Sequence, residues 1–239
     1  MLSNVPDYVY ITFILLCGIT LFFFIRLLVA PLIATAQTKS AWIIGLGIFV
    51  WLGLHSSLAL QGYYTSQYIF LPRVLLMLLP PILAIVVALI FLWKSDYINR
   101  LSLKTMTNIH VFRFPLELVV FTGLASSGNI PEIMTLYGRN PDILVGITAP
   151  IIGYLYFSKK SISPRILLAW NIISLLMLIN ISTIAILSLP YPFQQFGLDQ
   201  PNVAVINFPF IFLPCFLVAL AYFCHIMSIY KILVYENNV

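Results

Sequence analysis

Apolar residues along the chain form seven long runs, separated by short polar connections. A helix rises about 1.5 Å per residue and the hydrocarbon core of a bilayer is about 30 Å thick, so about 20 apolar residues cross it. The pattern predicts transmembrane helices at approximately Tyr8–Ala30, Ala41–Leu60, Val74–Trp93, Asn108–Ser126, Asp142–Phe157, Arg165–Leu189 and Ile206–Tyr230. We therefore expect an all-α integral membrane protein, with residues 1–239 forming a single seven-helix domain.

The composition agrees with a membrane protein and excludes several other classes. Hydrophobic residues make up 62% of the chain and charged residues 8%, whereas soluble domains have about 45–50% and about 25%. This difference excludes an ordinary water-soluble enzyme and a disordered segment. The net charge of +5 is too small to attract nucleic acid. The expected partner is the lipid bilayer, and a small molecule or a lipid is the candidate ligand.

The positions of the basic residues predict the orientation of the helices. With the N-terminus outside and the C-terminus cytoplasmic, the inner segments hold eight basic residues and the outer loops hold two, Arg73 and Arg139. The eight are Lys39, Lys94, Arg100, Lys104, Lys159, Lys160, Arg165 and Lys231. Basic residues resist translocation, so this asymmetry favours that orientation. We expect the protein in a bacterial cytoplasmic (inner) membrane.

Aromatic residues are frequent in the three connections expected on the outer side. They are Tyr63, Tyr64, Tyr68, Phe70, Tyr137, Tyr191, Phe193 and Phe196. Aromatic side chains at this level typically form the belt at the membrane surface. The alternative is a lid over an outward-facing cavity.

Prolines lie inside four of the predicted spans. They are Pro80 and Pro81, Pro115, Pro150, and Pro209 with Pro214. A proline lacks an N–H and displaces the carbonyl four residues earlier, so it kinks its helix and frees that carbonyl. In a membrane the freed group needs a partner from a neighbouring helix, a side chain or water.

The fourth span carries the strongest candidate chemistry, in the sequence TNIHVFRFPLELVVF. His110, Arg113 and Glu117 are spaced i, i+3 and i+7, so they share one face of the helix. Glu117 lies about 13 Å from Asn108 along the helix, near the bilayer midplane. A central carboxylate costs about 2.5–3.5 kcal/mol on insertion scales, so it should face the bundle interior. Arg113 is one turn away, close enough for an intrahelical ion pair.

Two interpretations of this face remain open. In the first, Arg113 snorkels towards the headgroups and Glu117 only fixes helix packing. In the second, the face lines a polar cavity in which His110 and Glu117 exchange protons. Ionisable residues within a membrane are candidates for function, which favours the second.

A second polar cluster is YGRNPDILVG. Asp142 follows a proline and precedes an apolar run, as expected in the first turn of a helix, where its charge suits the dipole. The alternative is an outward-facing entrance or ligand site formed by Arg139, Asn140 and Asp142.

Secondary polar residues occur on other spans, namely His55, Asn171, Asn180 and His225. Interhelical hydrogen bonds of about 0.6 kcal/mol each would account for them. Histidines on separate helices can also bind haem or a metal. His110 and His225 are expected towards the inner face and His55 towards the outer, so only one pair can meet. No motif identifies a metal or a cofactor, and the cofactor stays unknown.

These observations lead to three hypotheses of function. The first is proton-linked transport or small-molecule binding, with Glu117 carrying the proton, Arg113 as its electrostatic partner and His110 as the relay towards the cytoplasm. The second is an intramembrane enzyme that acts on a lipid or isoprenoid with Glu117 and Asp142, whose expected depths differ. The third is a structural membrane protein whose buried charges only fix packing.

Overall fold

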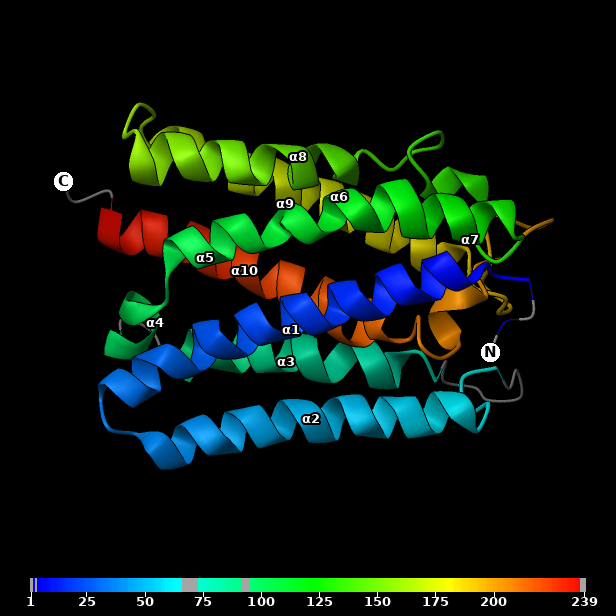
Figure 1. Cartoon of the computed structure of the whole chain (residues 1–239), viewed down its shortest axis with the longest axis horizontal. Coiled ribbons are helices and arrows are strands. Elements are labelled where there is room, and N and C mark those ends of the chain that lie inside the picture. Colours follow the sequence, from blue (N-terminus) through cyan, green and yellow to red (C-terminus); the bar gives the residue numbers. More distant parts are fainter. Residues whose placement is uncertain (1, 3, 66–72, 92–94, 237–239) are drawn as a thin grey trace.

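The computed structural model describes residues 2, 4–65, 73–91 and 95–236, and every regular element in these ranges is helical (Figure 1). Five helical stretches are long and apolar enough to cross a bilayer. They are Asp7–Ala34, Thr38–Leu60, Leu103–Ser126, Pro164–Leu187 and Leu213–Tyr235. Two shorter apolar helices are Leu75–Ile90 and Asp142–Ser158. This set of helices is compatible with an integral membrane protein.

Helical segments cover all seven apolar runs within the described residues. The first elements are α1 (Asp7–Ala34), α2 (Thr38–Leu60), α3 (Leu75–Phe91) and the short α4 (Asp96–Arg100). The later ones are α5 (Leu103–Asn108), α6 (Arg113–Pro115), α7 (Thr122–Ser126), α8 (Asp142–Gly153), α9 (Pro164–Leu187) and α10 (Ala219–Lys231). The end of the predicted third span, together with Lys94, Tyr68 and Phe70, lies outside the described residues.

One membrane helix changes its winding along its length, and we call residues Leu103–Ser126 the interrupted helix. It begins as α5, tightens into a 3-10 turn at Ile109–Phe112, returns to α6, widens into a π-helical segment at Leu116–Phe121 and ends as α7. Pro115 lies at the change from tight to wide winding. Because proline removes one backbone donor, regular i to i−4 bonding cannot continue through it, and π-helical turns often mark functional sites.

The last membrane helix begins later than the sequence pattern predicts. Residues Ala204–Ile206 form a separate 3-10 turn, and the continuous helix starts at Leu213 rather than at Ile206. Pro209 therefore precedes the helix, and Pro214 lies in its first turn, where a missing N–H is tolerated. We call Leu213–Glu236 the C-terminal helix; it consists of a π-helical segment, α10 and a second π-helical segment.

The interrupted helix and the C-terminal helix form the centre of the bundle. In each, 56% of the most apolar stretch is buried, against 17% for α2, which lies at one edge of the bundle (Figure 1). The other edge is formed by α8 and α9. Trp51 on α2 donates its indole N–H to the carbonyl of Cys215 at 2.9 Å, which gives one carbonyl of the π-helical segment a partner on a neighbouring helix.

Helix α8 approaches the interrupted helix through a face of small residues. Gly146, Ala149 and Gly153 are buried on this face, at the spacing that lets two membrane helices pack closely. A Cβ on Gly146 would overlap the backbone nitrogen of Phe114, and one on Gly153 would overlap the Asn108 amide. The close approach therefore depends on glycine at these two positions.

The connections that follow α2, α7 and α9 are held together by buried hydrogen bonds. Tyr191 donates its hydroxyl to the carbonyl of Tyr64 at 2.6 Å, and the Tyr64 hydroxyl lies 2.6 Å from Nδ1 of His55. Gln200 donates to the carbonyls of Ala125 and Ile130. Burial of Tyr64 and Tyr191 places these two aromatics in the packing between segments, whereas Tyr137 is 79% exposed.

Candidate functional site

The only ion pair among the described residues joins the interrupted helix to α8. Nη1 of Arg113 lies 3.1 Å from Oδ2 of Asp142, and both side chains are nearly inaccessible. Asp142 occupies the first turn of α8 as its sequence context predicts, and Gly146 one turn later allows that helix to come close to Arg113. A buried charge pair in a membrane is stable only when both partners are held in good geometry.

Glu117 has a different partner. Its Oε2 accepts a 2.6 Å hydrogen bond from Nδ2 of Asn140, and the same amide nitrogen donates to the carbonyl of Met134 at 2.8 Å. Oδ1 of Asn140 accepts from the backbone N–H of Asp142. Asn140 therefore connects the π-helical turn that carries Glu117 to the start of α8. The spacing of Arg113 and Glu117 predicted an ion pair within one helix. Instead, Arg113 contacts Asp142 and Glu117 contacts Asn140.

Arg113, Glu117 and Asp142 line one small cavity, which we call the Arg113 cavity. Its volume is about 40 Å³, enough for water-sized occupants. Residues of α9 and the C-terminal helix close the remaining sides, among them Leu178 and Leu217. Nη2 of Arg113 and Oδ1 of Asp142 have no hydrogen-bond partner within the described part of the chain. Glu117 and Asp142, which the sequence places at different depths, both line this cavity.

The predicted entrance cluster is divided by the structure. Asn140 and Asp142 are 2% and 4% exposed, so they belong to the buried site. Arg139 is exposed, and its carbonyl accepts a hydrogen bond from Asn180 on α9 at 2.8 Å. The sequence left open an outward-facing entrance formed by these three residues, but the connection before α8 carries Asn140 to Glu117 and Asp142 to Arg113.

A second buried group lies around His110 and His225, which we call the His pair. Their rings are stacked, with centroids 3.8 Å apart and planes 10° apart. Nδ1 of His225 lies 3.0 Å from Oδ1 of Asn171 on α9. All three residues are completely buried. The expectation that one pair of histidines on separate helices can meet is confirmed for His110 and His225.

The remaining histidine has a local structural contact. His55 on α2 is hydrogen-bonded to the Tyr64 hydroxyl and packs against Trp51, near the C-terminal end of its helix and apart from the His pair. Among the described residues, no group of three or more His, Cys, Asp or Glu side chains is arranged to hold a metal ion. Cys17, Cys215 and Cys224 are free and buried.

Several residues that shape the site were missed by sequence reasoning. Met134 is fully buried and lines the Arg113 cavity. Trp170 packs beside both histidines and donates its N–H to Thr148 on α8 at 2.9 Å. Gly146 carried a usable signal, since it forms a small-residue face with Ala149 and Gly153 at i, i+3 and i+7. Met134 and Trp170 carried none, because their roles depend on tertiary contacts.

Comparison with known proteins yields a family without an assigned activity. A family model described as "Domain of unknown function (DUF8737)" matches residues 70–233, which include the interrupted helix, α8, α9 and the Arg113 cavity, while α1 and α2 precede the match. No curated protein and no solved structure matches the chain. Since the matched segment covers more than half of the chain, the protein belongs to the DUF8737 family.

Proposed function

We propose that the protein performs proton-linked transport and that Glu117 carries the proton. The observation that supports this most is the charge around the Arg113 cavity, where one guanidinium faces two carboxyl groups. Asp142 takes the ion pair with Arg113, which leaves an ionised Glu117 without an ion-pair partner of its own. An unpaired carboxylate in a low-dielectric interior is costly, and a bound proton removes that cost.

The surroundings of Glu117 suit a group that gains and releases a proton. Glu117 is 2% exposed, and a neutral amide, Asn140, rather than a cation holds it. An amide N–H donates to a carboxyl oxygen in either protonation state. The Arg113 cavity next to it has room for water, the carrier that proton movement through a buried site requires.

A short segment separates this cavity from the outer surface. Met134 lines the Arg113 cavity on one side, while Glu132 and Thr135 line a surface hollow of about 480 Å³ on the other. The 3-10 turn Glu132–Met134 is held by the bond from Asn140 to the Met134 carbonyl. Movement of this turn would connect the hollow with the cavity. On the side of Arg113 that faces away from this turn, His110 lies one helical turn earlier on the interrupted helix.

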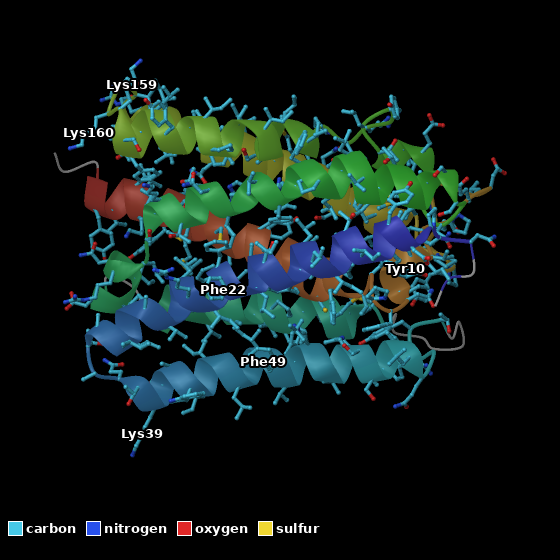
Figure 2. All side chains as sticks on the ribbon, viewed as in Figure 1. Tyr10, Phe22, Lys39, Phe49, Lys159 and Lys160 are labelled. Carbon is cyan, nitrogen blue, oxygen red and sulfur yellow. The ribbon has the colours of Figure 1, made fainter. Side chains whose placement is uncertain are left out.

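The proposal includes the arrangement in the membrane. It places α3 and α8, the shorter apolar helices, across the bilayer as well, which gives seven spans in a bacterial inner membrane. Lys39, Lys159 and Lys160 lie at one end of the bundle and Tyr10 lies near the other (Figure 2). With the basic end cytoplasmic, the N-terminus is outside, and Glu132 and Thr135 face the outer side.

The experiment is a proton-flux measurement on the full chain in lipid vesicles that contain a pH-sensitive dye. A pH gradient is imposed, and potassium with valinomycin prevents a membrane potential from stopping the flux. We expect wild-type vesicles to lose the gradient faster than empty vesicles, and Glu117→Gln to return the rate to that of empty vesicles. Asp7→Asn, an exposed carboxylate in the first turn of α1 and outside the proposed path, is the matched control and should retain flux. Equal rates for wild type and Glu117→Gln would contradict the proposal.

A second candidate function is favoured by one observation. Glu117 and Asp142 line the same cavity between apolar helices, so an intramembrane enzyme that uses them as acid and base on a lipid or isoprenoid is geometrically consistent. Such an enzyme would convert a lipid extract to a new product in detergent, detectable by mass spectrometry, and would not dissipate a pH gradient.

A further inference from the structure

The His pair contains several buried hydrogen-bonding groups that lack a partner in the part of the chain that the structure describes. Both ring nitrogens of His110 and Nε2 of His225 are buried without a partner among the described residues. A polar group that is removed from water and left unpaired loses the hydrogen bonds that it made to the solvent. Three of them in one place indicate a bound ligand, because buried polar groups in native proteins are almost always satisfied.

Asn171 determines which nitrogen of His225 carries the hydrogen. The amide nitrogen of Asn171 donates to the carbonyl of Leu167, one turn earlier on α9, at 2.9 Å. Its oxygen therefore faces His225 and accepts from Nδ1–H. In neutral His225 the hydrogen is then on Nδ1, and Nε2 is an unprotonated acceptor.

The stacking geometry excludes direct transfer between the two rings. Imidazole donors and acceptors lie in the ring plane, and these planes are nearly parallel with centroids 3.8 Å apart. Neither ring can therefore point an N–H at a nitrogen of the other. A water at the ring edges can contact both, since it donates and accepts together.

We propose that the His pair binds a buried water and forms a proton relay in which Asn171 is a positioning residue. When His110 carries an added proton, that proton passes to the water while the water gives one to Nε2 of His225. His110 returns to the neutral state and His225 becomes the cation, its Nδ1–H still held by Asn171. The relay role rests on the proton movement proposed above, whereas the water and the tautomer do not.

The charges near the pair are consistent with transient occupancy by a proton. The positive charge of Arg113 repels a proton added to either ring. The carboxylate of Asp142, which is paired with Arg113, reduces this repulsion. The groups that α9 and α8 contribute nearby, Asn171, Trp170 and Thr148, are neutral.

The test is nitrogen NMR on the full chain in bilayers with ¹⁵N-labelled histidine rings. The chain has three histidines, so single His substitutions assign the signals. We expect His225 as the Nδ1–H tautomer and magnetisation transfer from water to rings of the pair. Asn171→Leu should shift the tautomer towards Nε2–H, and Asn180→Leu, on the exposed side of the same helix, should leave it unchanged. An Nε2–H tautomer in the wild type, or rings without contact to water, would overturn the inference.

Proton flux separates this inference from the proposed function. His225→Phe keeps an aromatic ring against His110 but removes the relay nitrogen, and it should lower the flux at least about 100-fold, the lower end of the range for a lost acid–base group. His55→Phe is the matched control and should retain flux. If the wild type conducts and His225→Phe conducts equally, the relay is wrong and the role of Glu117 stands. If the NMR result is obtained but the wild type does not conduct, the water site stands and the proposed function fails.

Discussion

Arg113 pairs with Asp142, 29 positions later in the chain, and not with Glu117 one turn away on its own helix. This choice of partner leaves a neutral amide as the hydrogen-bond donor to Glu117. The two carboxyl groups of the Arg113 cavity therefore have different environments, one ionic and one polar. Different environments for neighbouring carboxyl groups are what separates their proton affinities.

The first prediction concerns this asymmetry. Asp142→Asn leaves the buried guanidinium of Arg113 without a counter-charge and should destabilise the protein by about 3–5 kcal/mol. Glu117→Gln retains an oxygen that accepts from Asn140, so its cost should be under about 1 kcal/mol. Unfolding in increasing SDS, followed by tryptophan fluorescence, measures both.

A double variant provides the control for this prediction. Arg113→Met together with Asp142→Leu removes both charges, and replacing a buried pair by apolar residues is often neutral or stabilising. The double variant should be more stable than Asp142→Asn alone. If Asp142→Asn and Glu117→Gln cost the same, the assignment of Asp142 as the partner of Arg113 is wrong.

The second prediction concerns the approach of α8. Gly146→Ala forces a methyl group into the Phe114 backbone and should destabilise the protein by about 1–3 kcal/mol, the usual cost of overpacking. Gly45→Ala on α2 has open space around the new methyl group and should be neutral or slightly stabilising, because alanine favours helix. Thermal unfolding of the two variants in one detergent makes the comparison. Equal melting temperatures would show that the helices do not approach this closely.

The third prediction concerns Asn140, whose amide donates to both Glu117 and the Met134 carbonyl. Asn140→Leu removes both bonds, so it should destabilise the protein by about 1–3 kcal/mol and loosen the 3-10 turn Glu132–Met134. Hydrogen–deuterium exchange of residues 130–136 should therefore accelerate, while exchange in α9 stays unchanged. Unaltered protection of that turn would remove the proposed gating role of Asn140.

The fourth prediction is a pH dependence at the end of the bundle that contains α4. Tyr97 on α4 donates its hydroxyl to the carbonyl of Leu28 on α1 at 3.0 Å, and burial raises the pKa of Tyr97 to about 12. Because this pKa lies above the value of about 10 in an unfolded chain, the contribution of Tyr97 to stability is complete below pH 10. It is lost as the pH rises from about 10 to about 12.

Tyr97→Phe isolates this contribution. At pH 8 the variant should be less stable than the wild type by about 0.5–1.5 kcal/mol, the value of one hydrogen bond. At pH 11 the difference should be smaller, since the Tyr97 hydroxyl is ionised in the unfolded chain but still mostly protonated in the folded protein. Denaturant unfolding of both proteins at the two pH values tests this, and a difference that does not change with pH would count against the buried hydroxyl.

The sequence predicted the positions of most helices because their apolar runs are long and bounded by polar residues. It failed at the start of the C-terminal helix, where residues 206–212 are as apolar as a span but Pro209 and Pro214 interrupt regular bonding. The orientation and the number of spans remain predictions, since both depend on the membrane.

The candidate site was predicted in its residues but not in its pairings. Helical spacing brought His110, Arg113 and Glu117 to one face, and all three are buried there. The partner of Arg113 was missed for two reasons. The expected i, i+4 contact assumes a uniform α-helix, whereas the winding changes at Phe112 and at Pro115. In addition, Gly146 allows α8 to approach closely. The stacking of His110 on His225 depends on the depth of two helices, which sequence spacing gives only approximately.

Infrared spectroscopy of the membrane-reconstituted protein provides the decisive measurement, because the carbonyl stretch of a protonated carboxyl group is separate from that of a carboxylate. At neutral pH we expect one such band in the wild type, shifted in D₂O, absent from Glu117→Gln and retained in Glu132→Gln. A wild-type spectrum without this band, or a band that persists in Glu117→Gln, would contradict the assignment of the exchangeable proton to Glu117.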